Sequence, residues 1–309
     1  MARSKRQPPR GMQRLHPRWW GTWLLVFLMW LIAWLPWRLQ QAIGSGLGRV
    51  LYALGGSRRR VTEANIDACF PSLDAAQREQ LVRDTFVANA KGYIECTVGW
   101  WRSAKPYARR MRLHGDDTVR ETLASGRGIL LLGAHFSILD FALPLVAEVA
   151  PVAYMFRPND NPLLNEVIER RRGAFRAGAF TKFQLREMID HVRAGNMCWY
   201  ACDQDMGRRN SVFAPLFGVP AATLTTPGWL ARETGARVMF LSQFRHADGV
   251  YEVRFTDFPD AFPSDDEVEN ARMINAMIEQ EVGRDPAQYL WLHRRFKTRP
   301  EGEPPIYGG

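Results

Sequence analysis

Residues 128–140 read GILLLGAHFSILD, and this stretch carries the strongest structural signal in the chain. Its first half, 128–134, is a short continuous apolar run, which is typical of a strand buried on both faces of a parallel sheet. A helical segment, 137–149, follows at once. The stretch therefore predicts a strand that passes into a helix, with His135 at the carboxyl end of the strand.

The segments downstream repeat this alternation of strand and helix. Further strands are predicted at 152–156, 197–203, 236–244 and 250–255, and helices at 161–175, 182–195, 226–235 and 264–283. Such alternation is typical of an α/β domain with a mostly parallel sheet flanked by helices, here over 126–309. Ligand sites in these domains lie at the carboxyl ends of the strands.

Composition narrows the classes of partner. The 309 residues are 46% apolar, which excludes a disordered chain, and the net charge is +9, which favours an anionic partner. Nucleic acid is not expected, because no helix-turn-helix, zinc-finger or base-stacking signature is present. The four cysteines form no Cys-x-x-Cys pair, so neither a disulfide framework nor a metal site is expected.

The N-terminal region contains an uncharged, tryptophan-rich run at 19–37. A helix of this length would measure about 28 Å, enough for the hydrocarbon core of a bilayer. Its tryptophans gather at both ends, as interfacial belts do. A cleaved signal peptide is the alternative, but the run is too long and no small-residue cleavage site follows it. The sequence predicts a retained membrane helix at 19–37, after a basic tail at 1–18.

Basic residues lie on both sides of this run, in 1–18 and again at Arg38, Arg49 and 58–60. Positive charge on both sides favours a tilted or interfacial helix whose ends return to one leaflet of anionic inner-membrane lipid. An amphipathic, helical region is expected over 38–125. Within it, the Gly44-x-x-x-Gly48 pair predicts either a close helix contact or a flexible junction.

His135 and Asp140 are the first candidates for catalysis. Inside one regular helix they would lie about 140° apart and could not meet. If His135 precedes the helix, Asp140 in an early turn can reach its ring, fix the tautomer and support the imidazolium. The pair then predicts a histidine general base that acts on a hydroxyl. A capped, purely structural histidine is the alternative.

Several other motifs of group-transfer enzymes are missing from the sequence. It has no Gly-x-Ser-x-Gly elbow, no Walker loop and no Gly-x-Gly-x-x-Gly fingerprint. A base without an accompanying nucleophile favours direct attack by a substrate hydroxyl.

The stretch from His135 to Asp140 resembles the His-x-x-x-x-Asp block of the glycerolipid acyltransferases. Further blocks, in order, resemble the lipid A lauroyl/myristoyl acyltransferases of Gram-negative bacteria, with the lauroyl branch most similar: 65–71, 156–162, 203–207, 213–217 and 291–300. The resemblance covers roughly residues 15–303. In one respect the chain departs from it, since Asp140 stands where the lauroyl branch often has glutamate.

The resemblance implies a reaction. A fatty acyl thioester on acyl carrier protein is the donor, and a hydroxyl on a 3-hydroxyacyl chain of the Kdo-bearing lipid A precursor is the acceptor. No cofactor and no metal are implied. Because acyl carrier protein is cytoplasmic, the catalytic domain is expected at the cytoplasmic face of the inner membrane. The alternatives are transfer to another glycolipid or phospholipid, and a catalytically silent, membrane-tethered protein that binds anionic lipid.

The resemblance also implies roles for residues beyond the pair. Arg157 is the catalytic candidate for stabilising the oxyanion or holding a phosphate, with a surface salt bridge as the alternative. Asp203 and Asp205 either structure a loop, for example by pairing with Arg208 or Arg209, or build the floor of the pocket. The same two arginines are candidates for binding the phosphates or Kdo carboxylates of the lipid.

A late basic cluster completes the set. His293, Arg294 and Arg295 are expected to contact anionic lipid or acyl carrier protein, with a solvated basic tail as the alternative. Asn159, in the block 156–162, is a further substrate-binding candidate. The run 170–172 is either a docking face for the acidic carrier protein or an exposed helix face.

Overall fold

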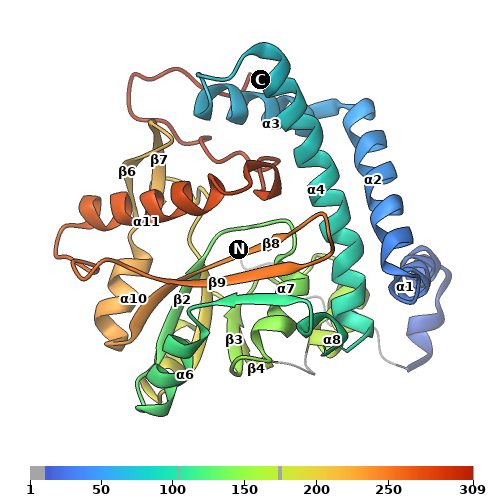
Figure 1. The fold of residues 1–309 in the computed structure, drawn as a ribbon, viewed down its shortest axis with the longest axis horizontal. Helices are drawn as coiled ribbons and strands as arrows, with labels where there is room; N and C mark the ends of the chain where they lie inside the picture. The colour runs from blue at the N-terminus through green and yellow to red at the C-terminus, as the bar shows by residue number, and fades with distance from the viewer. Residues whose placement is uncertain (1–10, 104, 173–175, 309) are drawn as a thin grey trace.

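The computed structural model describes residues 11–103, 105–172 and 176–308. Residues 1–10 of the predicted basic tail therefore lie outside the described residues. Figure 1 shows a central twisted sheet with helices on both sides, and the long helix α4 (Ala75–Trp101) running beside it.

The central sheet has seven strands in the order β1-β9-β8-β2-β5-β3-β4. Only β8 and β9 pair antiparallel, and the remaining neighbours pair parallel. The mostly parallel sheet flanked by helices is thus confirmed. The strands are β1 (Met111–His114), β2 (Ile129–Gly133), β3 (Val152–Met155), β4 (Arg176–Phe180), β5 (Met197–Ala201), β8 (Arg237–Arg245) and β9 (Tyr251–Asp257).

The two faces of the sheet carry separate apolar cores. In β2, Leu130 and Leu132 belong to one cluster, and Ile129 and Leu131 to the other, so the whole strand is buried, as its apolar run predicts. The first cluster includes residues of α9 (Leu185–Arg193), α10 (Thr226–Thr234) and α11 (Glu267–Val282), and the second those of α6 (Asp116–Ala124) and α7 (Leu139–Val146).

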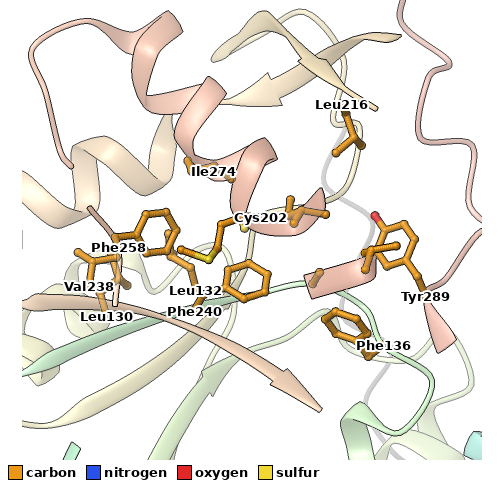
Figure 2. Close-up of a cluster of buried hydrophobic side chains, with 14 of the residues drawn as sticks. Leu130, Leu132, Phe136, Cys202, Leu216, Val238, Phe240, Phe258, Ile274 and Tyr289 are labelled. Atoms are coloured by element: carbon orange, nitrogen blue, oxygen red, sulfur yellow. The ribbon is translucent and has the colours of Figure 1, made fainter. Parts of the chain in front are cut away.

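The first core extends from the middle of the sheet to its carboxyl edge. Figure 2 shows Leu132 and Phe240 on the strands beneath Ile274 of α11. Towards the edge, the rings of Phe136 and Tyr289 meet edge-on with centroids 6.2 Å apart. The core therefore supports the loop that follows β2.

Some strands were not predicted. β1 lies in the region 38–125 that was expected to be helical, and β4 is the opposite edge of the sheet. A second, two-stranded sheet consists of β6 (Ser211–Leu216) and β7 (Val219–Leu224), joined by a tight turn at Phe217 and Gly218, both with positive φ. These strands are short or lie at edges, where the apolar pattern is weak.

The predicted membrane helix at 19–37 is wrong. The run is broken into α1 (Trp20–Ala33), which is preceded by the short 3-10 turns η1 (Gly11–Leu15) and η2 (Pro17–Trp19), and the start of α2 (Trp37–Leu54). Pro36 has no N–H and disfavours helical backbone at the residue before it, so α1 ends early. Gln40 donates to the freed carbonyl of Ala33. Within the described part of the chain, no helix combines the length and apolarity needed to cross a bilayer.

The Gly44-x-x-x-Gly48 pair makes a close helix contact. A Cβ atom on Gly44 would lie 2.8 Å from the Cα of Lys91, and one on Gly48 would lie 2.5 Å from the Cα of Val87. Both partners are on α4, so α2 packs backbone to backbone against it. The region between the two helices forms α3 (Gly56–Cys69), and the one-turn helix α5 (Lys105–Ala108) follows α4.

Helix α4 also presses against the loop after β2. A Cβ atom on its Gly92 would lie 1.8 Å from the carbonyl oxygen of Ser137, and one on Gly99 would lie 3.3 Å from that of Asp140. At Gly92 only glycine leaves room for this approach, and at Gly99 a side chain would be in tight contact. The backbone between His135 and Asp140 is therefore held from behind by α4.

Candidate active site

His135 and Asp203 meet at the carboxyl edge of the sheet. β2 and β5 are neighbours, with Gly133 paired to Ala201 in register. His135 lies two residues beyond Gly133, and Asp203 lies two residues beyond Ala201. Because both strands are parallel and end together, their next side chains share one edge.

The contact between them is close and double. Nδ1 of His135 lies 2.6 Å from Oδ1 of Asp203, and the backbone N–H of His135 donates to Oδ2 at 2.9 Å. The Asp203 side chain is 3% exposed and that of His135 26% exposed. The carboxylate is therefore interior, while the imidazole reaches the surface of the site.

The electrostatics of this pair favour a charged carboxylate beside a basic imidazole. Burial alone would lower the pKa of His135, but the charge and hydrogen bond of Asp203 outweigh burial and raise it. Burial likewise opposes the charged form of Asp203, but His135 lowers the pKa of that carboxyl to about 2. Asp203 therefore accepts a hydrogen bond from Nδ1–H, and Nε2 of the neutral ring carries the lone pair.

Two further buried residues support Asp203. The Tyr289 hydroxyl lies within hydrogen-bonding reach of the carboxylate, and burial together with that charge raises the pKa of Tyr289 well above its usual value. Arg295 is 2% exposed, and its positive charge contributes to the low pKa of Asp203. Neither role was predicted, because both residues lie far from Asp203 in the chain.

The segment that carries Tyr289 also fixes the backbone of the loop that contains His135. It follows η3 (Pro286–Gln288), and Leu290 donates its N–H to the carbonyl of His135 at 3.0 Å. Ser137 donates its N–H to the carbonyl of Gln288 at 2.7 Å. Asn65, from α3, in turn donates to the carbonyl of Trp291 at 2.7 Å. Two backbone hydrogen bonds thus join the loop that contains His135 to the distant segment 288–290.

The spacing of the two residues predicted that Asp140 orients His135 by a hydrogen bond, and this prediction is wrong. It lies in the first turn of α7, and its carboxylate pairs with Arg172 at the end of α8 (Pro162–Arg172). Asp203 occupies Nδ1 instead. Asp140 still contributes charge that favours the protonated imidazole.

Arg172 belongs to the run 170–172, for which docking of the carrier protein was one prediction. Its side chain is 18% exposed, and its guanidinium lies over the rings of Trp100 and Tyr154. It is therefore an interior partner of Asp140. Arg170, in contrast, is 68% exposed and pairs with Glu166.

We expect Arg172→Gln to cost about 1–3 kcal/mol of unfolding free energy, because the half-buried Asp140 would lose its charged partner. Acyl transfer should fall as well, since Asp140 lies in the first turn of the helix that follows His135. Chemical denaturation and steady-state kinetics measure the two effects. Arg170→Gln removes only a surface ion pair and is the matched control, expected within about 0.5 kcal/mol of wild type. Equal effects of both variants would contradict this assignment.

Arg157 and Asn159 do not join the pair. The Arg157 side chain is 83% exposed, and its partner is Asp160, at 3.5 Å. Its position agrees with the surface salt bridge that was the alternative. Asn159 is exposed, and its side chain accepts from the N–H of Asn161, at the start of α8. Within the described ranges, neither residue has a hydrogen bond or ion pair with His135 or Asp203.

Asp205 anchors the segment around Thr298 beside the site by hydrogen bonds. It is 1% exposed and accepts from the N–H and hydroxyl of Thr298, at 2.7 and 2.8 Å. It therefore structures a loop, although without the predicted pairing to the neighbouring arginines. Arg208 and Arg209 are exposed, and Arg208 donates to the carbonyl of Arg299 at 2.7 Å.

The late basic cluster is divided between interior and surface. Arg295 donates to the carbonyl of Ala222 at 2.9 Å inside the protein, so it cannot contact a surface partner as predicted. Burial lowers the pKa of His293, which also feels the charges of Asp203 and His135. Arg294 is exposed and lines a hollow of about 140 Å³ together with Ser57, Arg60 and Tyr307.

One polar side chain lies directly on the free nitrogen of the candidate base. Nε2 of Gln204 is 3.3 Å from Nε2 of His135. Gln204 lies between the inward-pointing Asp203 and Asp205, and it is only partly buried. Its place in the block 203–207 was visible in the sequence, but nothing in that pattern indicates which way its amide points.

Comparison with known proteins shows which family the chain belongs to. The family model for bacterial lipid A biosynthesis acyltransferases matches residues 7–298. The lipid A biosynthesis lauroyltransferase of Escherichia coli (strain K12) is 35% identical over 295 residues, which are 95% of this chain and 96% of that protein. The palmitoleoyltransferase of the same strain is 31% identical, with 95% and 96% covered.

The myristoyltransferase of Escherichia coli (strain K12) is also similar, at 30% identity over 93% of this chain and 90% of that protein. The matches extend over almost the whole described chain, from the N-terminal helices to the segment that pins His135. The chain therefore belongs to the bacterial lipid A biosynthesis acyltransferase family, and it is an acyltransferase.

Proposed function

We propose that this protein transfers a fatty acyl chain, lauroyl in the first instance, from acyl carrier protein to a hydroxyl of a 3-hydroxyacyl chain on the Kdo-bearing lipid A precursor. The observation that carries the proposal is the pair formed by His135 and Asp203 at the carboxyl edge of the sheet. Such a pair suits a base that activates a hydroxyl. Membership of the family supports the class of acceptor.

The mechanism begins with proton transfer to Nε2 of His135. Asp203 holds the Nδ1 proton and stabilises the imidazolium as it forms. The acceptor oxygen attacks the thioester carbonyl, and the carbon–oxygen bond forms. The tetrahedral intermediate then collapses with loss of the carrier protein's thiolate, which takes the proton from Nε2.

Direct transfer, without an acyl-enzyme, is favoured by the surroundings of the base. Cys202 lies beside Asp203, but burial raises the pKa of its thiol well above the usual range, so it is a poor nucleophile. Within the described residues, no serine or cysteine is hydrogen-bonded to Nε2 of His135, whose side-chain partner there is Gln204. The acceptor hydroxyl is therefore the proposed nucleophile.

The experiment that tests the proposal compares donors. The purified protein in detergent receives lauroyl-acyl carrier protein or lauroyl-coenzyme A, together with the Kdo-bearing precursor or a diacylglycerol phosphate. We expect transfer from the carrier protein to the precursor, and no acyl adduct on the enzyme by intact mass. Transfer only from coenzyme A, or only to the phospholipid acceptor, would contradict it. The net charge of +9 suits an acidic carrier protein.

The proposed location is the cytoplasmic face of the inner membrane, in contact with anionic lipid. Helices α1 and α2 expose a dense set of large apolar side chains, among them Trp20, Leu24, Phe27, Leu31, Val50 and Leu54. Arg18, just before α1, and Arg38 and Arg49, both on α2, supply positive charge. Exposed apolar surface next to basic groups suits a membrane surface.

We expect the double variant Leu24→Ser/Phe27→Ser to bind vesicles of phosphatidylethanolamine and phosphatidylglycerol about 10–100-fold more weakly. The two half-exposed side chains together would contribute about 1.5–3 kcal/mol of transfer free energy. Co-sedimentation measures the partition coefficient. Phe183→Ser, which removes a 79% exposed side chain outside α1 and α2, is the matched control. Equal partition coefficients of the double variant and wild type would contradict the proposal that these helices contact the membrane.

A further inference from the structure

The side chain of Gln204 is hydrogen-bonded to Nε2 of His135, the atom that must take the proton in the proposed reaction. Its neighbours on both sides point inward and are anchored, Asp203 on His135 and Asp205 on Thr298. The backbone of Gln204 is thus fixed, while its partly buried side chain faces the open side of the imidazole. Within the ranges that the structure describes, its amide is the one side-chain group hydrogen-bonded to Nε2 of His135, at 3.3 Å.

The direction of this hydrogen bond follows from the other side of the ring. Nδ1–H donates to the charged Asp203, so Nε2 is unprotonated and can only accept. The Gln204 amide N–H therefore donates to the lone pair of Nε2. The acceptor hydroxyl must donate to that same lone pair before it can lose its proton. Gln204 and the hydroxyl compete for one position.

We propose that Gln204 is a catalytic residue: its amide caps Nε2 of His135 in the resting enzyme, yields this position to the acceptor hydroxyl, and then donates to the oxyanion of the tetrahedral intermediate. The inference rests on the proposed function, in which His135 is the base. It adds a donor for the negative charge that lies at the base itself, whereas the Arg157 side chain is 83% exposed and pairs with Asp160.

The geometry suits this second position. The acceptor oxygen and the oxyanion are bonded to the same carbon, so they are next to each other when the acceptor oxygen lies at Nε2. An amide that has just left Nε2 can reach the oxyanion by rotating its own side chain, while the backbone between Asp203 and Asp205 stays fixed. Because only the side-chain torsions of Gln204 change, this move needs less reorganisation than a backbone movement, and low reorganisation favours oxyanion stabilisation.

A neutral donor also suits the base. A cation at this distance from Nε2 would disfavour the imidazolium that forms during the reaction. The amide adds no net charge, and it takes part in no proton or electron transfer. The proton still passes from the hydroxyl to Nε2 and then to the departing thiolate, while the carbon–oxygen bond forms and the carbon–sulfur bond breaks.

The test uses the purified full chain in detergent, with lauroyl-acyl carrier protein and the Kdo-bearing precursor as substrates. Gln204→Met keeps the length of the side chain and removes the amide. We expect kcat to fall by about 10²–10³-fold, as for loss of one oxyanion donor. KM for the acceptor should stay the same or fall, because the competing cap is gone. Met206→Ala, which changes a neighbouring 60% exposed side chain, is the matched control, expected within about twofold.

A second variant is tested by the pH dependence of kcat/KM, which would not shift if Gln204 had only a structural role. Gln204→Glu places a carboxylate against Nε2, which should raise the pKa of His135. The acidic limb of the kcat/KM profile should therefore move to higher pH. This variant also keeps the proposal testable if Gln204→Met fails to fold.

Two results would overturn the proposal while leaving the proposed function in place. The first is a Gln204→Met enzyme whose kcat equals or exceeds that of active wild type, because the amide would then only compete with the acceptor. The second is an unshifted acidic limb in Gln204→Glu. Absence of transfer by the wild type from any donor is a different result, since it refutes the proposed function itself.

Discussion

His135→Ala is expected to lower kcat for acyl transfer by about 10²–10⁴-fold, the usual contribution of a positioned general base. The reason is that Nε2 is the basic atom at the carboxyl edge of the sheet, with its tautomer set by the 2.6 Å contact to Asp203. KM for either substrate should change little, because the imidazole acts on the proton and not on the lipid as a whole. Steady-state kinetics with both substrates varied measures the two constants.

A second histidine provides the control for this variant. His246 lies after β8, and its ring contacts Glu252 at 2.9 Å, away from Asp203. His246→Ala should keep kcat within about twofold of wild type. If His135→Ala transferred at the wild-type rate with the same KM, His135 would be a capped structural histidine, and the mechanism proposed above would be wrong.

Asp203→Asn is expected to lower kcat by about 10³–10⁴-fold, comparable to loss of the orienting carboxylate in other histidine-based sites. An amide in place of the carboxylate can donate to Nδ1 and so favours the wrong tautomer. It also leaves the imidazolium without its buried counter-charge. Circular dichroism and thermal unfolding should accompany the kinetics, because Asp203 also accepts the backbone N–H of His135.

The same variant should change the pH dependence in a defined direction. The base must be neutral, so kcat/KM falls as pH drops through the pKa of His135. Asp203 raises this pKa, so the wild-type midpoint should lie above about 6.5. Removing the carboxylate leaves burial, which lowers the pKa, and the midpoint of Asp203→Asn should lie below that of wild type.

Asp140→Asn tests the carboxylate that sequence spacing had paired with His135. Asp160→Asn, which changes a surface carboxylate, is its control. Asp140 adds charge without a hydrogen bond to His135, so its variant should shift the midpoint less than Asp203→Asn. Asp160 is 84% exposed and should leave the profile unchanged. A larger shift in Asp140→Asn than in Asp203→Asn would contradict the geometry and restore the pairing that spacing alone had suggested.

Sequence reasoning placed the candidate base His135 after a buried strand, but it did not find the hydrogen-bond partner Asp203. The apolar run before His135 predicts a buried strand that ends in a loop, and this was confirmed. Asp203 follows another predicted strand, so both lie at carboxyl ends. What the pattern could not supply was the order of the strands: β5 is the neighbour of β2, although β3 and β4 lie between them in the chain. Asp140 was preferred because only local spacing was visible.

The N-terminal run shows a different limit. Its length and apolarity suggested one membrane helix, but Pro36, which the sequence itself shows, divides the run into two helices.

The prediction for the basic cluster near the end of the chain was wrong for another reason. A run of charges suggests a surface, yet Arg295 turns inward to Ala222 and Thr223, which only the packing of β7 against the last segment determines.

The most direct test of the central claim is a single-turnover reaction with excess enzyme. Wild type and His135→Ala are each mixed with lauroyl-acyl carrier protein and the Kdo-bearing lipid A precursor, and the lipid product is analysed by mass. The account predicts that wild type adds one lauroyl group, as an ester on a 3-hydroxyacyl chain, and that His135→Ala adds almost none in the same time. Equal product from both proteins, or no product from wild type with any acyl donor, would contradict it.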